Sequence, residues 1–273
     1  GDTGTCILKE VDVVIQLLDE QVTMTQAMTF SSFKGPFEDD ITAWDKTLNT
    51  VSELIDEWLA VQRSWLYLQP IFDSEDIKKQ LPTESKRFAN VNKTWRTTMR
   101  NAQKNPKAIE FCDSVKLYDQ FVEGNKFLDL VQKGLSDYLE TKRAGFSRFY
   151  FLSNDELLEI LSETKNPRRV QPHLKKCFEA IKSVRFEEDL SITAMISREK
   201  EKVELLDPIQ TTGKNVENWM SELEEAMCNA VRARMFESVL DYVQTPRTEW
   251  MQIWPGQCVL NGSQVLSCCC CCC

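Results

Sequence analysis

The sequence has little glycine and little proline, with 9 of each among 273 residues. These residues are the strongest local breaks in helices and strands, so their scarcity predicts long elements with few interruptions. Histidine is scarcer still, because His173 is the only one. Hydrophobic residues make up 42% of the chain and charged residues 27%. This composition is typical of a globular protein rather than a disordered one.

Long apolar runs and an excess of basic residues are also missing. No stretch of about 18 apolar residues occurs, so no membrane span is predicted. The first ten residues lack the basic-then-apolar order of a signal peptide. The chain also lacks an initiator Met, which favours a start inside a longer gene product. The formal net charge of -9 argues against binding to nucleic acid, tubulin or anionic lipid.

Cysteine is distributed unevenly. Five cysteines stand singly and are expected to be free, buried thiols: Cys6, Cys112, Cys177, Cys228 and Cys258. Six more are consecutive, at Cys268–Cys273. Zinc sites need spacers so that four sulfurs can converge. Residues 266–273 are therefore expected to form an unstructured tail or to be an artefact of the gene model, with adventitious metal binding or mixed disulfides as the alternative.

Apolar residues spaced by three and four positions predict helices over most of the chain. The longest stripe starts after Pro36, covers about 30 residues and is expected to end at Pro70. Other helices are expected at 7–25, 74–80, 88–99 (capped by Thr83), 117–138, 157–161 (after a capping box of Ser153 and Glu156), 172–184 and 216–235. Four tryptophans fall on such stripes and are expected in the core: Trp44, Trp58, Trp65 and Trp95.

Two segments depart from the helical pattern. Residues 146–152 hold five large apolar side chains within seven positions, more than one face of a helix can bury. They form either an internal joint between helical bundles or a surface for a partner. The basic residues Lys175, Lys176 and Lys182 favour a partner with an acidic surface. Residues 192–209 are expected to form a two-stranded hairpin.

The search for chemistry finds no catalytic residue, no cofactor-binding residue and no metal ligand. His173 is expected at the surface or at a helix cap. Gly213 and Lys214 are similar to the end of a phosphate-binding loop. However, Pro208 stands where that loop needs Gly, and Asn215 replaces the Ser or Thr that holds magnesium. The sequence therefore predicts a protein that is not an enzyme and needs no cofactor.

Several stretches resemble the N-terminal linker region of dynein heavy chains, in that family's order across roughly residues 40–265. The first stretch is WLAVQRSWLYLQPIF at 58–72, which continues at 74–77 and 80–82. The second is YLETKRAGFSRFYFLSNDELLEIL at 138–161, and the third is VQPHLKKCFEAI at 170–181. The fourth is 194–203 together with VENW at 216–219, and the last is WPGQ at 254–257. The stretch MTQAMTFS at 24–31 is more similar to axonemal than to cytoplasmic heavy chains.

Three positions depart from the family pattern. Ser147 stands where the family usually has Pro, and Lys200 stands where the hairpin turn usually has Gly. A glycine adopts a positive φ without strain, whereas lysine does so only at a cost. After Gln264 the family's continuation is replaced by VLSCCCCCC. The chain is thus expected to stop before the rest of the linker and the AAA+ ATPase modules.

The resemblance implies a mainly α fold, an elongated stack of helical bundles with one small β-hairpin. The expected organisation is an N-terminal helix and loop (1–36), a helical linker region (37–265) and the cysteine tail (266–273). The implied function is a lever that couples ATP-driven changes in the AAA+ ring to microtubule-based movement. The implied location is the cytoplasm and cytoskeleton, in a cilium or flagellum axoneme. The implied partners are that ring and other dynein chains, with microtubules contacted only indirectly. A generic helical scaffold or spectrin-like tether is the alternative.

Overall fold

The computed structural model describes residues 4–112, 114–162 and 166–271, with only the backbone for 267–271. The chain divides into two compact units, Gly1–Ser136 and Asp137–Cys273. The division falls inside a helix of the region that the sequence predicts as one linker segment. Both units are mainly helical, as the sequence predicts. Among the described residues, no helix has the length and apolarity that a membrane crossing requires.

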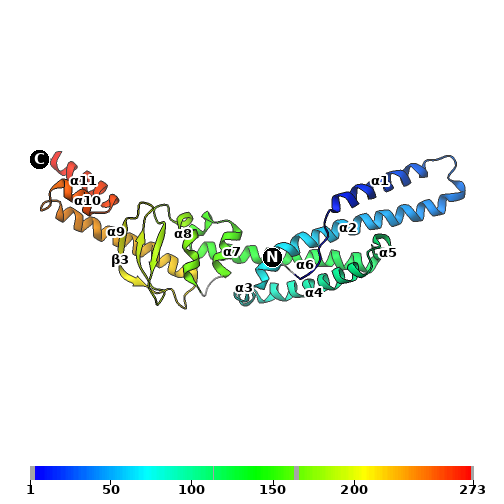
Figure 1. Cartoon of the computed structure of the whole chain (residues 1–273), viewed down its shortest axis with the longest axis horizontal. Helices are drawn as coiled ribbons and strands as arrows, with labels where there is room; N and C mark the ends of the chain where they lie inside the picture. Colours follow the sequence, from blue (N-terminus) through cyan, green and yellow to red (C-terminus); the bar gives the residue numbers. More distant parts are fainter. Residues whose placement is uncertain (1–3, 113, 163–165, 272–273) are drawn as a thin grey trace. The chain divides into compact units, whose positions relative to one another are not determined.

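The first unit is built from helices of very different length (Figure 1). They are α1 (Val11–Thr29), η1 (Gly35–Phe37), α2 (Glu38–Asp73), α3 (Glu75–Gln80), α4 (Pro82–Lys104), α5 (Ala108–Cys112) and the first part of α6 (Val115–Gly145). α1 packs against α2. The buried residues of α2 begin at Leu48 and end at Phe72.

Aromatic rings fill the core between the long helices of this unit. Trp58 of α2 stacks on Phe121 of α6 with ring centroids 5.2 Å apart, and Trp65 of α2 lies 5.5 Å from Trp95 of α4. The Trp65 indole N–H donates to Asn92 Oδ1 at 3.0 Å, which gives its polar edge a partner. Tryptophan combines a large apolar area with one polar group that needs such a partner.

Some predictions for this unit are wrong. The helix expected to end at Pro70 continues to Asp73 as α2. Phe72 is buried and stacks on Phe88 with ring centroids 5.1 Å apart, and this contact stabilises the last turn. Trp44 is 43% exposed because it lies in α2 before the stretch whose residues are buried. Thr83 does not cap α4, which begins one residue earlier at Pro82; proline suits the first helical position, since no hydrogen bond is lost there.

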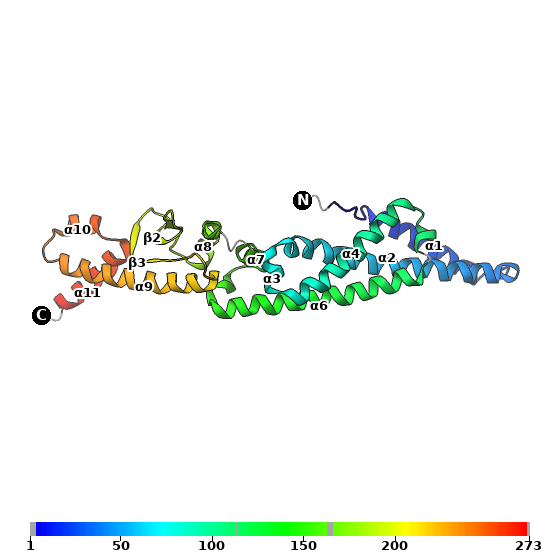
Figure 2. The ribbon, with the colours of Figure 1, turned by 90° about the horizontal axis from the view of Figure 1, so that it is seen from below.

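The second unit combines short helices with a three-stranded antiparallel sheet in the order β1-β2-β3. Its elements after α6 are η2 (Ser147–Phe151), α7 (Asn154–Ser162), η3 (Pro167–Val170), α8 (Gln171–Cys177), β1 (Ser183–Phe186), β2 (Ile192–Ile196), β3 (Lys202–Ile209), α9 (Val216–Asp241), α10 (Arg247–Ile253) and α11 (Gly256–Cys271). α9 packs along the sheet through β3, and α11 packs against α9 (Figure 2). The hairpin predicted at 192–209 is confirmed as β2 and β3.

Two expectations about the helices of the second unit are wrong. The helix expected over 172–184 ends at Cys177, and Ser183–Phe186 form β1, whose Val184 pairs with Met195. The fold therefore has one strand more than a hairpin. The tail expected to be unstructured from residue 266 is helical as far as Cys271, where α11 ends. Residues 272 and 273 lie outside the described residues.

Candidate interaction surface of the second unit

The aromatic segment 146–152 forms a 3-10 turn with a buried side and an exposed side. A 3-10 helix has three residues per turn, so every third side chain points the same way. Phe146, Phe149 and Leu152 point inward and are buried, whereas Tyr150 and Phe151 are 60% and 68% exposed. The segment therefore has a buried and an exposed side. Three of the five side chains pack inside the second unit, and the other two face the solvent.

The buried side of the turn is held by rings and by one arginine. The Phe146 and Phe149 rings pack edge to face with centroids 5.0 Å apart. Arg143, at the end of α6, is itself buried and donates to the Leu152 carbonyl at 3.2 Å and to Asn154 Oδ1 at 2.8 Å. These contacts fix the backbone that carries Tyr150 and Phe151. No local sequence pattern indicates the role of Arg143, because its partners Leu152 and Asn154 lie in the following turn.

The exposed side has its own polar contact. The Tyr150 hydroxyl donates to Glu140 Oε2 at 3.1 Å. This hydrogen bond to the carboxylate, with the charge of Glu140, raises the pKa of Tyr150. The Arg143 guanidinium lies 5.9 Å from the Tyr150 ring centroid. Tyr150 is thus held at one end and exposes most of its ring, as expected for a side chain at a contact surface.

The capping box predicted at Ser153 and Glu156 is present. The Glu156 backbone N–H donates to Ser153 Oγ, and the Ser153 backbone N–H donates to Glu156 Oε2. Glu156 also pairs with Lys176 of α8. The hydrogen bond from Lys176, followed by that from the Ser153 backbone, lowers the pKa of Glu156 to about 2.

The basic residues expected on one helix lie on different elements. Lys175 and Lys176 are exposed on α8, whereas Lys182 lies just before β1 and donates its backbone N–H to the Ile196 carbonyl. Because α8 ends at Cys177, the three do not form a single helical face. Lys176 is engaged with Glu156. The basic surface is therefore less concentrated than the sequence suggested.

The hairpin turn at 197–201 is exposed and internally hydrogen-bonded. Ser197 Oγ accepts from the backbone N–H groups of Glu199 and Glu201, both at 3.2 Å. Lys200 has φ 71°, in the left-handed region that glycine adopts most easily. The expectation that lysine here occupies a glycine-like position is confirmed.

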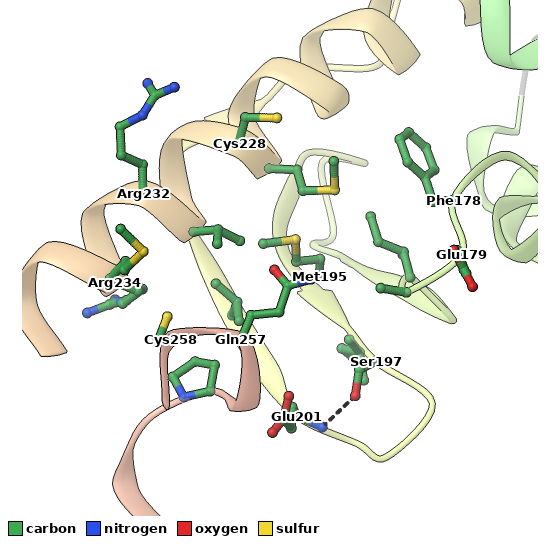
Figure 3. A pocket seen from close by; sticks show the side chains of 18 of the residues that line it. Phe178, Glu179, Met195, Ser197, Glu201, Cys228, Arg232, Arg234, Gln257 and Cys258 are labelled. Carbon is green, nitrogen blue, oxygen red and sulfur yellow. Dashed lines mark hydrogen bonds between the residues drawn. The ribbon is translucent and has the colours of Figure 1, made fainter. Parts of the chain in front are cut away.

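A groove of about 730 Å³, which the sequence did not predict, lies beside this turn (Figure 3). Its apolar lining includes Met195 of β2, Val203 of β3, and Met227 and Met235 of α9. The start of α11 closes one end, where the Gly256 backbone N–H donates to Glu201 Oε1 at 3.0 Å. These residues are far apart in the sequence, so no local pattern marks the groove.

Charged and thiol groups border the groove. Arg148 donates to Glu224 Oε1 at 2.9 Å and to the Cys177 carbonyl at 3.1 Å. Cys228 is exposed, and Cys258 is buried, which raises its pKa. Among the five single cysteines, Cys112, Cys177 and Cys258 are buried as expected, whereas Cys6 and Cys228 are exposed.

The residues considered for chemistry are engaged in structural contacts. His173 is buried rather than at the surface, with Nε2 3.4 Å from Glu159 Oε2. The Lys214 ammonium is 2.6 Å from both carboxylate oxygens of Glu222. Pro208 lies within strand β3. Over the described part of the chain, no group of three or more His, Cys, Asp or Glu side chains converges in a way that suits a metal ion.

Comparison with known proteins identifies the family. Residues 1–238 match the family model described as Dynein heavy chain, N-terminal region 2. Human Dynein axonemal heavy chain 1 is 51% identical over 262 residues, or 96% of this chain. Human Dynein axonemal heavy chain 12 is 47% identical and mouse Dynein axonemal heavy chain 3 is 45% identical, each over 97% of this chain.

The chain spans only 6% to 9% of the length of these relatives. The chain belongs to the dynein heavy chain family, and its similarity to axonemal members confirms the axonemal, cytoskeletal location expected from the sequence.

Proposed function

We propose that this chain is a mechanical linker segment of a dynein heavy chain, which couples ATP-driven changes in the AAA+ ring to microtubule-based movement. The observation that carries the proposal is the exposed pair Tyr150 and Phe151 on a turn whose opposite side is buried. A part that transmits force needs a contact point fixed to a rigid base. The buried Arg143 and the Phe146–Phe149 pair provide such a base.

Long helices with tightly packed interfaces support the same proposal. α2 has 36 residues, and at 1.5 Å per residue it extends about 54 Å. Its buried face meets aromatic rings from α4 and α6. Close-packed interiors have low compressibility and transmit strain, so a displacement at one end of this helix reaches the other end with little loss.

The proposed partners follow from the proposed role. Tyr150 and Phe151 contact the AAA+ ring of the same heavy chain, other dynein chains assemble with it, and microtubules are reached only indirectly. Hydrolysis of ATP belongs to the ring and not to this segment. A generic scaffold or spectrin-like tether is not favoured, because the chain belongs to the dynein heavy chains.

The test uses a dynein heavy chain that contains this segment. Changing Tyr150→Ala and Phe151→Ala together should leave the unfolding temperature of the segment nearly unchanged, since both side chains are exposed. The ATPase should continue while microtubule gliding slows or stops. Phe149→Ala should instead lower the stability by about 3–5 kcal/mol, as large core truncations do.

Phe236→Ala is the matched control, because Phe236 is an exposed aromatic residue on α9. It should change neither the ATPase nor gliding. Normal ATPase and normal gliding in the Tyr150 and Phe151 variant would show that these two side chains carry no force, and the proposal would be withdrawn.

A further inference from the structure

Arg148 lies in the turn that carries Tyr150 and Phe151, and it stands three residues before Phe151. Because a 3-10 helix has three residues per turn, Arg148 and Phe151 extend from the same side of η2. Phe151 is exposed, whereas the Arg148 guanidinium contacts two other elements. Its Nε donates to Glu224 Oε1 of α9 at 2.9 Å, and its Nη1 donates to the Cys177 carbonyl at 3.1 Å. Arg148 therefore joins the exposed turn to α8 and to α9.

The contact with α8 is made at the end of that helix. Cys177 is its last residue, and the last carbonyl groups of a helix have no partners within the helix. A positive charge is favourable at this end. The Arg148 guanidinium also lies 5.0 Å from the centroid of the buried Phe178 ring, which is within the range of cation–π attraction. Arg148 is thus held against α8 by a hydrogen bond and by an aromatic ring.

The contact with α9 is one of two ion pairs along the same side of that helix. Glu224 follows Glu217 by seven residues, or about two helical turns, so the two carboxylates lie on one side of α9. Glu217 pairs with Lys142 of α6, whose Nζ is 2.5 Å from Glu217 Oε1. The start of α9 lies beside the end of α6 (Figure 2). The first half of α9 is therefore joined to α6 by Lys142 and to η2 by Arg148.

The two helices that Arg148 contacts hold opposite edges of the sheet. β1 and β3 are the edge strands. α8 holds β1 through the Gln171 side chain, which bonds to both backbone groups of Val184. α9 packs along β3, which forms the hairpin with β2. Arg148 thus connects the exposed turn with both edges of the sheet.

We propose that Arg148 is a positioning residue that joins the Tyr150–Phe151 contact to α9, so that this turn, the sheet and α9 are displaced as one body. The proposal rests on the proposed function, because it assigns the residue through which movement of that contact reaches the rest of the second unit. Loss of the Glu224 carboxylate leaves Tyr150 and Phe151 in place but releases α9 from the turn. Part of the movement is then lost at this joint.

Removal of the Glu224 carboxylate tests the proposal in a dynein heavy chain that contains this segment. Glu224→Ala breaks the contact with α9 and leaves the other contacts of Arg148 in place, and alanine suits a helix. Microtubule gliding velocity should fall by about twofold or more, while the ATPase continues. The matched control is Glu225→Ala, which removes an exposed carboxylate from the next position of α9 and should leave gliding unchanged.

Three measurements separate positioning from a purely structural role. Exposed ion pairs contribute little to stability, and the Arg148 and Glu224 side chains are 33% and 37% exposed. The unfolding temperature of the 273-residue chain should therefore fall by less than about 4 °C in Glu224→Ala. Hydrogen exchange at the Leu152 amide, which donates to the Phe149 carbonyl, should stay slow because the turn remains folded. Exchanging the charges, with Arg148→Glu and Glu224→Arg together, should restore gliding above that of Glu224→Arg alone.

The outcomes distinguish this proposal from the lever function on which it rests. Normal gliding in Glu224→Ala, together with slowed gliding in the Tyr150 and Phe151 variant, would overturn the role of Arg148 and leave the lever function in place. Normal gliding in both variants would overturn both. Slowed gliding accompanied by faster exchange at the Leu152 amide would assign the ion pair to folding of the turn, and the positioning role would be rejected.

Discussion

Lys200 shows how a single residue can hold a backbone conformation that suits another residue type. Its φ of 71° lies in the left-handed region, where a non-glycine residue costs of order 1 kcal/mol. The turn is maintained by the Lys200 backbone N–H, which donates to the Ser197 carbonyl at 3.2 Å, and by the two bonds to Ser197 Oγ. The strain is therefore local and balanced by backbone hydrogen bonds.

We expect Lys200→Gly to leave the free energy of unfolding unchanged or to raise it by up to about 1 kcal/mol. Relief of the strain in the folded state opposes the greater entropy of glycine in the unfolded chain. Urea denaturation followed by circular dichroism measures the difference. The neighbouring Glu199→Gly is the control, because Glu199 does not have a positive φ; it should lower stability. A loss of more than about 1 kcal/mol in Lys200→Gly would show that the lysine side chain itself stabilises the turn.

At the scale of the elements, one edge of the sheet, strand β1, is protected by one side chain. Strand β1 lies at an edge of the three-stranded sheet, where unpaired backbone groups invite pairing with another chain. The Gln171 side chain occupies this position. Its Nε2 donates to the Val184 carbonyl at 2.7 Å, and its Oε1 accepts from the Val184 backbone N–H at 3.1 Å. One side-chain amide thus replaces a residue of a neighbouring strand.

We expect Gln171→Ala to destabilise the second unit by about 1–3 kcal/mol, because it leaves two partly buried backbone groups of Val184 without partners. Hydrogen exchange at the Val184 amide should become faster, which NMR can measure. Gln171→Glu keeps an acceptor but loses the donor, so it should fall between the wild type and Gln171→Ala. Unchanged exchange in Gln171→Ala would contradict this role.

The long helices were predictable from sequence, and the ends of elements and the third strand were not. The apolar residues from Ile41 to Leu68 recur with the helical period and so predict α2, and those from Leu48 onward are buried. Ile181 and Val184 continue the stripe of α8 equally well, yet they lie in a loop and a strand. Val184 lies in a strand rather than a helix because it pairs with Met195 of β2. This pairing depends on a distant segment, so local spacing does not reveal it.

At the scale of the whole chain, the candidate site was only partly predictable. The sequence marked 146–152 and the hairpin as unusual, and the three-residue period of the turn determined which aromatic side chains are exposed. The Met-lined groove is not marked by any local pattern. The groove joins β2, β3, α9 and α11.

The absence of a nucleotide site is the prediction that concerns the whole chain, and we expect no stoichiometric binding of Mg-ATP and no hydrolysis. A phosphate-binding loop presents free backbone N–H groups and a free lysine after a strand. Here Pro208 lies inside β3, and Lys214 is held by both carboxylate oxygens of Glu222. Isothermal titration calorimetry of the 273-residue chain with Mg-ATP measures binding directly.

The variant Lys214→Ala separates a true site from weak ionic contacts. We expect it to change neither the calorimetric signal nor the ATPase of a heavy chain that contains this segment, because Lys214 serves only its pair with Glu222. That exposed pair stabilises α9 by less than about 1 kcal/mol. One-to-one binding of Mg-ATP that Lys214→Ala abolishes would contradict this prediction. It would also contradict the proposed role, because the segment would then bind the nucleotide itself.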